Sequence, residues 1–343
     1  MEAGGIKVST PDCSLANKPQ GVQFIMIQFL IKRMVGLVFV VIGVTFITFI
    51  MGYFAPGDPI RNLLGQHFDP RLYVQLKHAY GLDLPWYQQY YNFLVRLLHF
   101  DFGLSFAQQD RSVWDILKGG APISIELGMW ALLIQILIGV PLGIISALKA
   151  STWIDTLNMG VALFFYAIPV FVLCVFVQVV LVWLDQHTGG SWPVSGWGNP
   201  WQYSWSDIQY KLAPILVFTV GGMAYIARLA RTSMLEVLRQ DYVRTARAKG
   251  LIERVVIYRH ALRNAMIPLV TILGVAIGFL VTGSFFIEQI FNIPGIAQIT
   301  ITSVNSRDYP VIQATTVMLA VAVVIGNLIS DLLYTVVDPR IKL

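Results

Sequence analysis

Charged residues are scarce in this chain, and their scarcity excludes most soluble folds. Only 13% of the 343 residues are charged and 56% are hydrophobic, whereas an average soluble domain carries about 25% charged residues. The apolar residues are also gathered in runs long enough to cross a hydrocarbon core, which takes about 20 helical residues. We therefore expect an all-α integral membrane protein, in which length reflects the number of membrane helices.

Cysteine and clustered metal ligands are equally scarce. Cys13 lies in a polar leader and Cys174 in the middle of an apolar run, so we expect two free thiols. The five histidines stand singly, so the sequence predicts no metal site. No lysine is followed by Ser or Thr, so the chain lacks the Lys-Ser or Lys-Thr pair with which a phosphate-binding P-loop ends. The sequence predicts no catalytic, cofactor-binding or metal-binding residue and therefore no enzyme activity; ATP, if it is used, would be bound by a partner.

Stretches without any Asp, Glu, Lys or Arg define the predicted membrane spans. There are six, and each is expected to be one transmembrane helix. The fourth is short, but Arg228 and Arg231 can extend it because long basic side chains reach toward the interface. The six spans are Met34–Phe54, Leu127–Leu148, Thr156–Leu184, Leu212–Ala227, Ala265–Ile287 and Tyr309–Ser330.

Basic residues give the predicted orientation. From Arg228 to Arg263 the chain contains nine Lys and Arg residues against three acidic residues, which places this loop in the cytoplasm by the positive-inside rule. An even number of spans then puts both termini in the cytoplasm. The predicted organisation is a polar leader, a first transmembrane segment, an extracytoplasmic subdomain and a core domain with five transmembrane helices, at residues 1–26, 27–54, 55–118 and 119–343.

Several residue types within or beside the spans carry further expectations. Charged residues are confined to predicted span ends, which disfavours a carrier with an ionisable group at mid-membrane. Glycines four residues apart, at 139 and 143 and at 274 and 278, permit close helix contact and are candidates for an interface with a second membrane subunit. Prolines 141, 169, 214 and 268 are expected to kink helices. Interfacial anchoring is predicted for Trp192, Trp197, Trp201 and Trp205.

The basic loop, residues 233–264, is the most informative segment. Ser233 and Glu236 match a capping box, which predicts a helix that begins at Ser233. Gly250 is expected to end this helix in a left-handed conformation, and a second helix is predicted from Ile252 to Asn264. From composition alone, the loop could anchor to anionic lipid headgroups or dock a cytoplasmic partner.

Ordered motifs give the chain a family resemblance from about residue 27 to residue 343. Residues 241–251 and 260–268 resemble the coupling loop of ABC importer permeases, more narrowly the B-type permease of the dipeptide, oligopeptide and nickel branch. The general signature opens with Glu-Ala-Ala, whereas this chain has Arg244-Thr245-Ala246, so no role for that glutamate carries over. Further matching motifs are Pro56-Gly57-Asp58-Pro59, Tyr80-Gly81-Leu82, Asp101-Phe102-Gly103-Leu104-Ser105, Pro193-Val194-Ser195-Gly196, Phe291-Asn292-Ile293-Pro294-Gly295, Arg307-Asp308-Tyr309-Pro310 and Asp338-Pro339-Arg340-Ile341.

This resemblance implies a type I ABC importer permease, a non-catalytic subunit of a bacterial or archaeal cytoplasmic membrane. The implied partners are a second homologous permease, two ATP-binding subunits that hold ATP and Mg, an extracytoplasmic substrate-binding protein and membrane lipid, with no nucleic acid. The implied substrates are dipeptides or oligopeptides; nickel complexes or oligosaccharides, or an ATP-independent carrier or channel, are the alternatives. The residues implied to couple ATP hydrolysis to transport are Asp241, Thr245, Ala246, Lys249 and Gly250.

Overall fold

The described chain is helical throughout. A computed structural model describes residues 20–55, 57–64, 69–108, 110–190, 192–280 and 283–337. Within these residues the only β pairing is an isolated bridge between Leu104 and Ser112, so the expected all-α fold is confirmed there. The leader up to residue 19, which includes Cys13, and the closing motif that begins at Asp338 lie outside the described residues.

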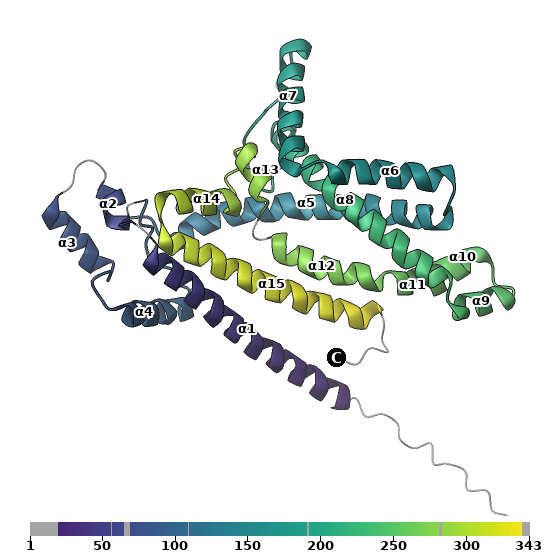
Figure 1. The fold of residues 1–343 in the computed structure, drawn as a ribbon, viewed down its shortest axis with the longest axis horizontal. Helices are drawn as coiled ribbons and strands as arrows, with labels where there is room; N and C mark the ends of the chain where they lie inside the picture. The colour runs from purple at the N-terminus through teal and green to yellow at the C-terminus, as the bar shows by residue number, and fades with distance from the viewer. Residues whose placement is uncertain are drawn as a thin grey trace, which may run out of the picture.

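The helices fall into a small subdomain and a long bundle (Figure 1). The subdomain contains α2 to α4, which follow the first long helix, and the bundle contains the rest. In chain order the first helices are α1 (Gln20–Phe54), α2 (Pro59–Leu64), α3 (Pro70–Ala79), α4 (Trp86–Leu98), α5 (Val113–Leu148), α6 (Trp153–Ala167) and α7 (Val170–Thr188). The remaining helices are α8 (Trp205–Leu238), α9 (Asp241–Ala248), α10 (Glu253–Val255), the π-helix η1 (Val256–Ala261), α11 (Leu262–Ala265), α12 (Ile267–Leu280), α13 (Phe285–Ile290), α14 (Ile296–Ser306) and α15 (Tyr309–Val337).

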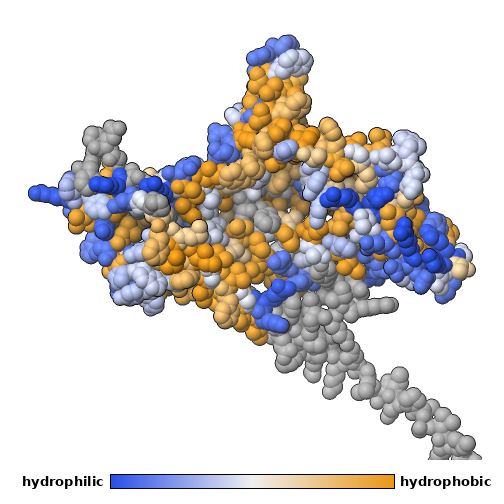
Figure 2. Space-filling model, viewed as in Figure 1, coloured by the Kyte–Doolittle hydropathy of each residue, from blue (hydrophilic) through white to orange (hydrophobic). Residues whose placement is uncertain are grey.

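Membrane-spanning helices match the predicted count in part. In the described part of the chain, five helices are long and apolar enough to cross a bilayer, within α1, α5, α7, α8 and α15. A bent pair, Glu253–Ala265 followed by Ile267–Gly278, makes a sixth if it is one span. Apolar side chains cover the middle of the molecule, and polar ones gather over the subdomain and over α9 and α10 (Figure 2), as expected for a membrane protein.

The third predicted span is wrong as a single helix. The chain breaks at Ile168 and Pro169, whose backbones are extended, and this separates α6 from α7. Proline has no N–H to continue the helical ladder, and it disfavours a helical conformation at the residue before it. After the break, α7 stands out from the bundle, crosswise to α6 (Figure 1).

The fourth and fifth spans also differ from the prediction. The fourth is secure, because Leu212–Ala227 lies inside the 34-residue helix α8, which runs through Pro214. The fifth begins at a break at Met266, where the helical segments Glu253–Ala265 and Ile267–Gly278 meet at an angle of 46°. Pro268 lies beside this break, and its missing N–H explains the kink. Helix α12 ends at Leu280, before the predicted end at Ile287.

Small residues at two helix crossings bring helices of this same chain into contact. A Cβ atom at Gly139 in α5 would lie 2.9 Å from the carbonyl oxygen of Met223 in α8. At Gly278 in α12, it would lie 2.7 Å from the Cα of Val323 in α15. Such contacts require glycine. The predicted interface with a second subunit at these glycines is therefore wrong: they pack α5 on α8 and α12 on α15.

Candidate functional site: the helical elbow after α8

The elbow is the segment from Arg239 to Ala265 that follows α8. The predicted helix start at Ser233 is wrong, because α8 continues to Leu238. Ser233 is buried inside that helix, and the neighbouring Met234 packs against Ala147 and Ala261. Packing against the bundle continues α8 past Ser233, so Ser233 and Glu236 do not begin a new helix. The new helix, α9, begins two residues after Arg239, at Asp241.

Helix α9 has one face against its own chain and one face exposed. Val243 and Ala246 are buried and pack with Val256 of η1. Residues three and four apart share a helix face. Five exposed positions with this spacing form what we call the α9 stripe, Asp241, Arg244, Thr245, Ala248 and Lys249; Tyr242 and Arg247 are exposed as well but lie outside it.

The predicted coupling residues therefore separate into two groups. Asp241, Thr245 and Lys249 lie in the α9 stripe, and the side chain of Asp241 is 97% exposed. Ala246 is buried, so it holds α9 on the bundle and presents nothing to a partner. The sequence motif placed all these residues in one group. Which of them face outward depends on the residue at which α9 begins, and the motif does not give that residue.

Gly250 ends α9 as predicted. Its φ is +77°, in the left-handed region. The Gly250 N–H donates to the Arg247 carbonyl at 2.9 Å, and the Leu251 N–H donates to the Ala246 carbonyl at 3.4 Å. These two bonds form a Schellman motif, which favours glycine at this position. No heavy atom lies within 4 Å of the place where a Cβ would stand, so the outer side of this turn is open.

An ion pair across the glycine turn was missed by the sequence analysis. The Arg247 guanidinium donates to the Glu253 carboxylate, with Nη2 and Oε1 2.6 Å apart. The six-residue spacing matches no helical or strand pattern, so only the turn brings the two together. Nearby, the Asn264 amide donates to the Tyr242 hydroxyl at 2.7 Å. Both contacts fix α9 relative to the segment that returns to the membrane.

The returning segment confirms the predicted second helix with one irregularity. It runs as α10, η1 and α11 without a break from Glu253 to Ala265. Val256 and Ala261 of η1 are fully buried, and Ala261 and Ala265 pack with Met234 of α8. Helix α9 therefore contacts both α8, which precedes it, and η1, which follows it.

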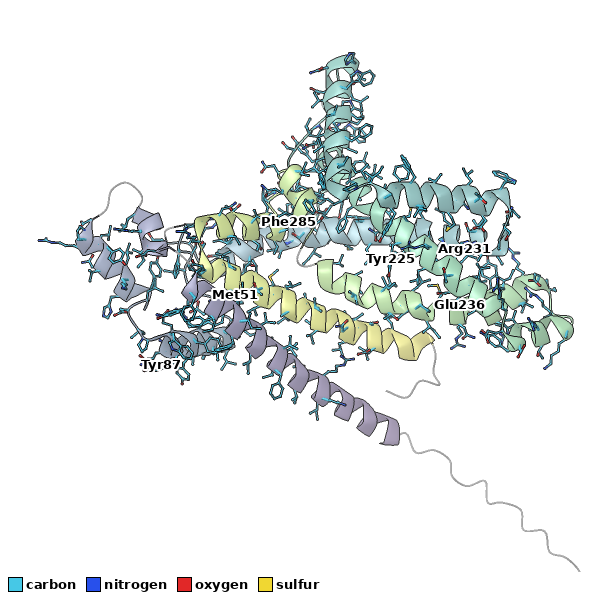
Figure 3. The ribbon with its side chains drawn as sticks, in the orientation of Figure 1. Met51, Tyr87, Tyr225, Arg231, Glu236 and Phe285 are labelled. Carbon is cyan, nitrogen blue, oxygen red and sulfur yellow. The ribbon has the colours of Figure 1, made fainter. Side chains whose placement is uncertain are left out.

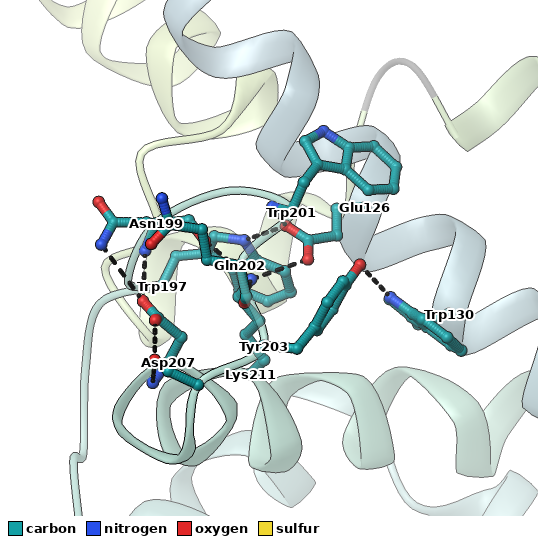
Figure 4. A network of polar contacts seen from close by, with 10 residues as sticks. Glu126, Trp130, Trp197, Asn199, Trp201, Gln202, Tyr203, Asp207 and Lys211 are labelled. Atoms are coloured by element: carbon teal, nitrogen blue, oxygen red, sulfur yellow. Dashed lines mark hydrogen bonds and ion pairs between the residues drawn. The ribbon is translucent and has the colours of Figure 1, made fainter.

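A second polar cluster lies where α5, α8 and the loop before α8 meet (Figure 4). Lys211 Nζ donates to Glu126 Oε1 at 2.8 Å and to the carbonyls of Asn199 and Gln202 at 2.8 and 2.7 Å. Glu126 Oε2 accepts 3.0 Å bonds from the Trp197 indole and the Trp201 N–H. Every charge-bearing group is thus paired, as buried charges require.

This cluster corrects one expectation. Trp197 is 2% exposed and bonded to Glu126, so the interfacial-anchor prediction is wrong for this tryptophan, while Trp201 and Trp205 are exposed. Glu126 lies inside α5, 13 residues after Val113 and directly before the predicted span that begins at Leu127. Lys211, on α8, neutralises the Glu126 carboxylate. No sequence spacing indicates this pairing.

Two distant motifs meet at the base of the subdomain. The buried Asp308 carboxylate accepts from the Ser105 hydroxyl and from the N–H groups of Phe106 and Ala107. This joins the motif of residues 101–105 to that of residues 307–310. A cavity of about 480 Å³ lies between the subdomain and the adjoining ends of α1 and α15.

The Phe291–Gly295 motif forms the turn between α13 and α14. Glu288, buried in α13, accepts N–H bonds from Ala297 and Gln298 at 2.9 and 3.2 Å and a bond from the Ser124 hydroxyl at 2.8 Å. A carboxylate at these amides satisfies free donors of the first turn of α14. Glu288 thus ties α13 and α14 to α5 beside the turn that the motif forms.

Comparison with known families decides the class. A family model described as the binding-protein-dependent transport system inner membrane component matches residues 139–343. A second model, for the N-terminal part of such membrane components, matches residues 26–128. The chain belongs to this family. The predicted resemblance to ABC permeases is thereby confirmed, and the protein is an inner-membrane component.

Named relatives of this transport component cover almost the whole chain. The dipeptide transport system permease of Bacillus subtilis is 39% identical over 93% of this chain and 99% of its own length. The oligopeptide transport system permease of the same organism is 35% identical over 92% and 100%. The glutathione transport system permease of Shigella flexneri is 34% identical over 92% and 99%.

A solved structure supports the fold of this family member. A chain of the inward-facing MetNI methionine ABC transporter matches with a TM-score of 0.51 and 19% identity, over 65% of this chain and 96% of that chain. At this identity the likeness concerns the fold alone. It agrees with the expected permease architecture for the core.

Proposed function

We propose that this chain is one of two pore-forming subunits of an ATP-driven importer that carries dipeptides or oligopeptides across the cytoplasmic membrane. The observation that carries the proposal is the match of over nine tenths of the chain to permeases that are named for dipeptide, oligopeptide and glutathione transport. All three names denote peptides. The nickel and oligosaccharide alternatives gain no such support.

The elbow is the proposed contact with an ATP-binding subunit. Its α9 stripe is exposed, while the opposite face is packed on α8 and η1. Closure of two ATP-binding subunits on ATP and Mg would push α9. The contacts of α9 with α8 and η1 would pass this motion to α8 and, through α11, to α12. Rocking of packed helices between two arrangements is a known mode of switching. This chain itself would perform no chemistry.

The proposed orientation places the elbow and both termini in the cytoplasm and the α2–α4 subdomain outside. The basic residues of the elbow support this assignment. An extracytoplasmic binding protein would deliver the peptide on the subdomain side, and a second, homologous permease would complete the path. The apolar helix α7, which is barely buried within this chain, offers a surface for the second permease or for lipid.

Co-purification tests the proposed assembly. A tagged chain, expressed with its genomic neighbours and extracted in detergent, should bring down a second permease and ATP-binding subunits, and the complex should hydrolyse ATP. Recovery of the chain alone or as a homo-oligomer, with the neighbours present in the same membranes, would contradict the assignment and favour an ATP-independent carrier or channel.

A further inference from the structure

Two arginines one helical turn apart on α8 have different surroundings. Arg231 donates from Nε and Nη2 to the two carboxylate oxygens of Asp155 in α6, both at 2.6 Å. Figure 3 shows Arg231 on the part of α8 that runs beside α6. This paired geometry satisfies the charge of Arg231. Among the described residues, the neighbouring arginine, Arg228, has no such carboxylate partner.

Arg228 is held by two aromatic rings instead. Its guanidinium carbon lies 5.0 Å from the ring centre of Tyr166 in α6 and 5.8 Å from that of Tyr225 in α8. In the described part of the chain, no carboxylate forms an ion pair with Arg228. The two ring contacts supply no hydrogen-bond acceptor for the five N–H donors of the guanidinium, so these donors can bind an anion.

A groove leads away from Arg228 between α6 and α8. Its volume is about 460 Å³, within the range of ligand pockets. At Gly160 no heavy atom lies within 4 Å of a Cβ position, which leaves the floor of the groove open. Apart from the two arginines, Asp155 and Thr156, the lining is apolar or aromatic: Met159, Gly160, Ala162, Leu163, Tyr166 and Ala224.

The position of Arg228 along α8 matches the level of lipid phosphates. Arg228 comes 23 residues after Trp205, which is about 35 Å at 1.5 Å per residue. Trp205 is 70% exposed at the start of α8, as expected at one membrane interface. Since the hydrocarbon core is about 30 Å thick, a helix that enters the membrane near Trp205 would bring Arg228 to the opposite interface, on the side of the elbow.

We propose that the α6–α8 groove binds one anionic phospholipid from the leaflet on the side of the elbow. Its phosphate would accept from the in-plane N–H groups of Arg228, and one acyl chain would lie along Gly160 and Leu163. A guanidinium matches a phosphate in a bidentate way. An anionic lipid is favoured over a zwitterionic one because the site carries an unbalanced positive charge. This site depends on neither the transported substrate nor the ATP-binding partners.

Native mass spectrometry of the assembled complex, released from membranes that contain phosphatidylglycerol and phosphatidylethanolamine, tests the proposal. The wild type should retain phosphatidylglycerol preferentially, and Arg228→Gln should reduce its retention about tenfold, the loss of one charge-assisted contact. Arg239→Gln is the matched control, since Arg239 is exposed beyond the groove, and it should retain the lipid. Addition of inorganic phosphate should not displace the lipid, because the acyl chain contributes to binding; displacement by phosphate would overturn the proposal.

A second variant separates lipid loss from misfolding. Gly160→Leu fills the groove without touching Arg228 and should also expel phosphatidylglycerol while the complex stays assembled. Three outcomes would each overturn the proposal. The wild type and Arg228→Gln could retain phosphatidylglycerol equally, or the wild type could retain both lipids equally. The complex could also hold no lipid in the groove because another subunit covers it.

Discussion

The ammonium of Lys211 lies 2.8 Å from the carboxylate of Glu126, although 85 residues separate them. Both side chains are almost completely buried, at 3% and 0% exposure. Lys211 also lies over the rings of Trp197 and Tyr203, 5.6 and 4.8 Å from their centres. This ion pair therefore fixes the loop before α8 to both α5 and α8.

Breaking this ion pair on one side should cost more than removing it altogether. Lys211→Met leaves the Glu126 carboxylate buried without its counter-charge and should destabilise the protein by about 3 to 5 kcal/mol. Adding Glu126→Gln removes the stranded charge and should recover part of that loss. The measurement is the thermal unfolding midpoint in detergent, with Lys149→Met at an exposed helix end as the control. A double variant no more stable than Lys211→Met would contradict the interpretation.

Gly250 offers a test that separates backbone strain from a lost contact. Gly250 and Gly189 both have positive φ, +77° and +63°, and both have open space at the Cβ position. A tryptophan at either position should therefore cost a similar amount, about 1 to 2 kcal/mol. Only Gly250→Trp obstructs the surface next to the α9 stripe. We expect it to abolish peptide uptake with assembly intact, and Gly189→Trp to transport normally; normal uptake by Gly250→Trp would exclude a coupling role.

Cross-linking should distinguish the two faces of α9. In a chain without its native cysteines, Thr245→Cys and Lys249→Cys should cross-link to an ATP-binding subunit with a short bifunctional reagent, because both positions are exposed. Ala246→Cys should not, because that position packs against Val243 and Val256. Cross-links from all three positions, or from Ala246→Cys alone, would show that α9 is rotated relative to this account.

The sequence predicted those features that depend on local chemistry. Long charge-free runs located α1, α5, α8 and α15, and the glycine at 250 located the end of α9, because burial in lipid and a positive φ each restrict composition. It failed where tertiary contacts decide. The capping box at Ser233 was overridden by burial of α8. The split at Pro169 has a local cause, and the span prediction missed it because hydropathy alone joins α6 and α7.

Pairings across large separations were invisible for the same reason. Glu126 and Lys211, or Ser105 and Asp308, come together only once the helices have packed. The resemblance identified residues 101–105 and 307–310 as motifs, but nothing in their order indicated that one bonds to the other.

The Asp308 junction should hold the subdomain on the bundle. Asp308→Ala leaves the N–H groups of Phe106 and Ala107 without their acceptor, at a cost of about 1 to 3 kcal/mol. We expect faster limited proteolysis between residues 57 and 108, with the bundle unaffected. Asp185→Ala, an exposed carboxylate at the far end of α7, is the control. Unchanged cleavage in Asp308→Ala would mean that other contacts suffice.

Uptake of a labelled dipeptide by proteoliposomes tests the central claim most directly. The vesicles would contain this chain with its co-purified permease and ATP-binding partners, with ATP on the elbow side and the binding protein on the subdomain side. We predict uptake that requires both ATP and the binding protein and that stops when either is omitted. Uptake without ATP, driven by an ion gradient alone, would contradict the importer assignment.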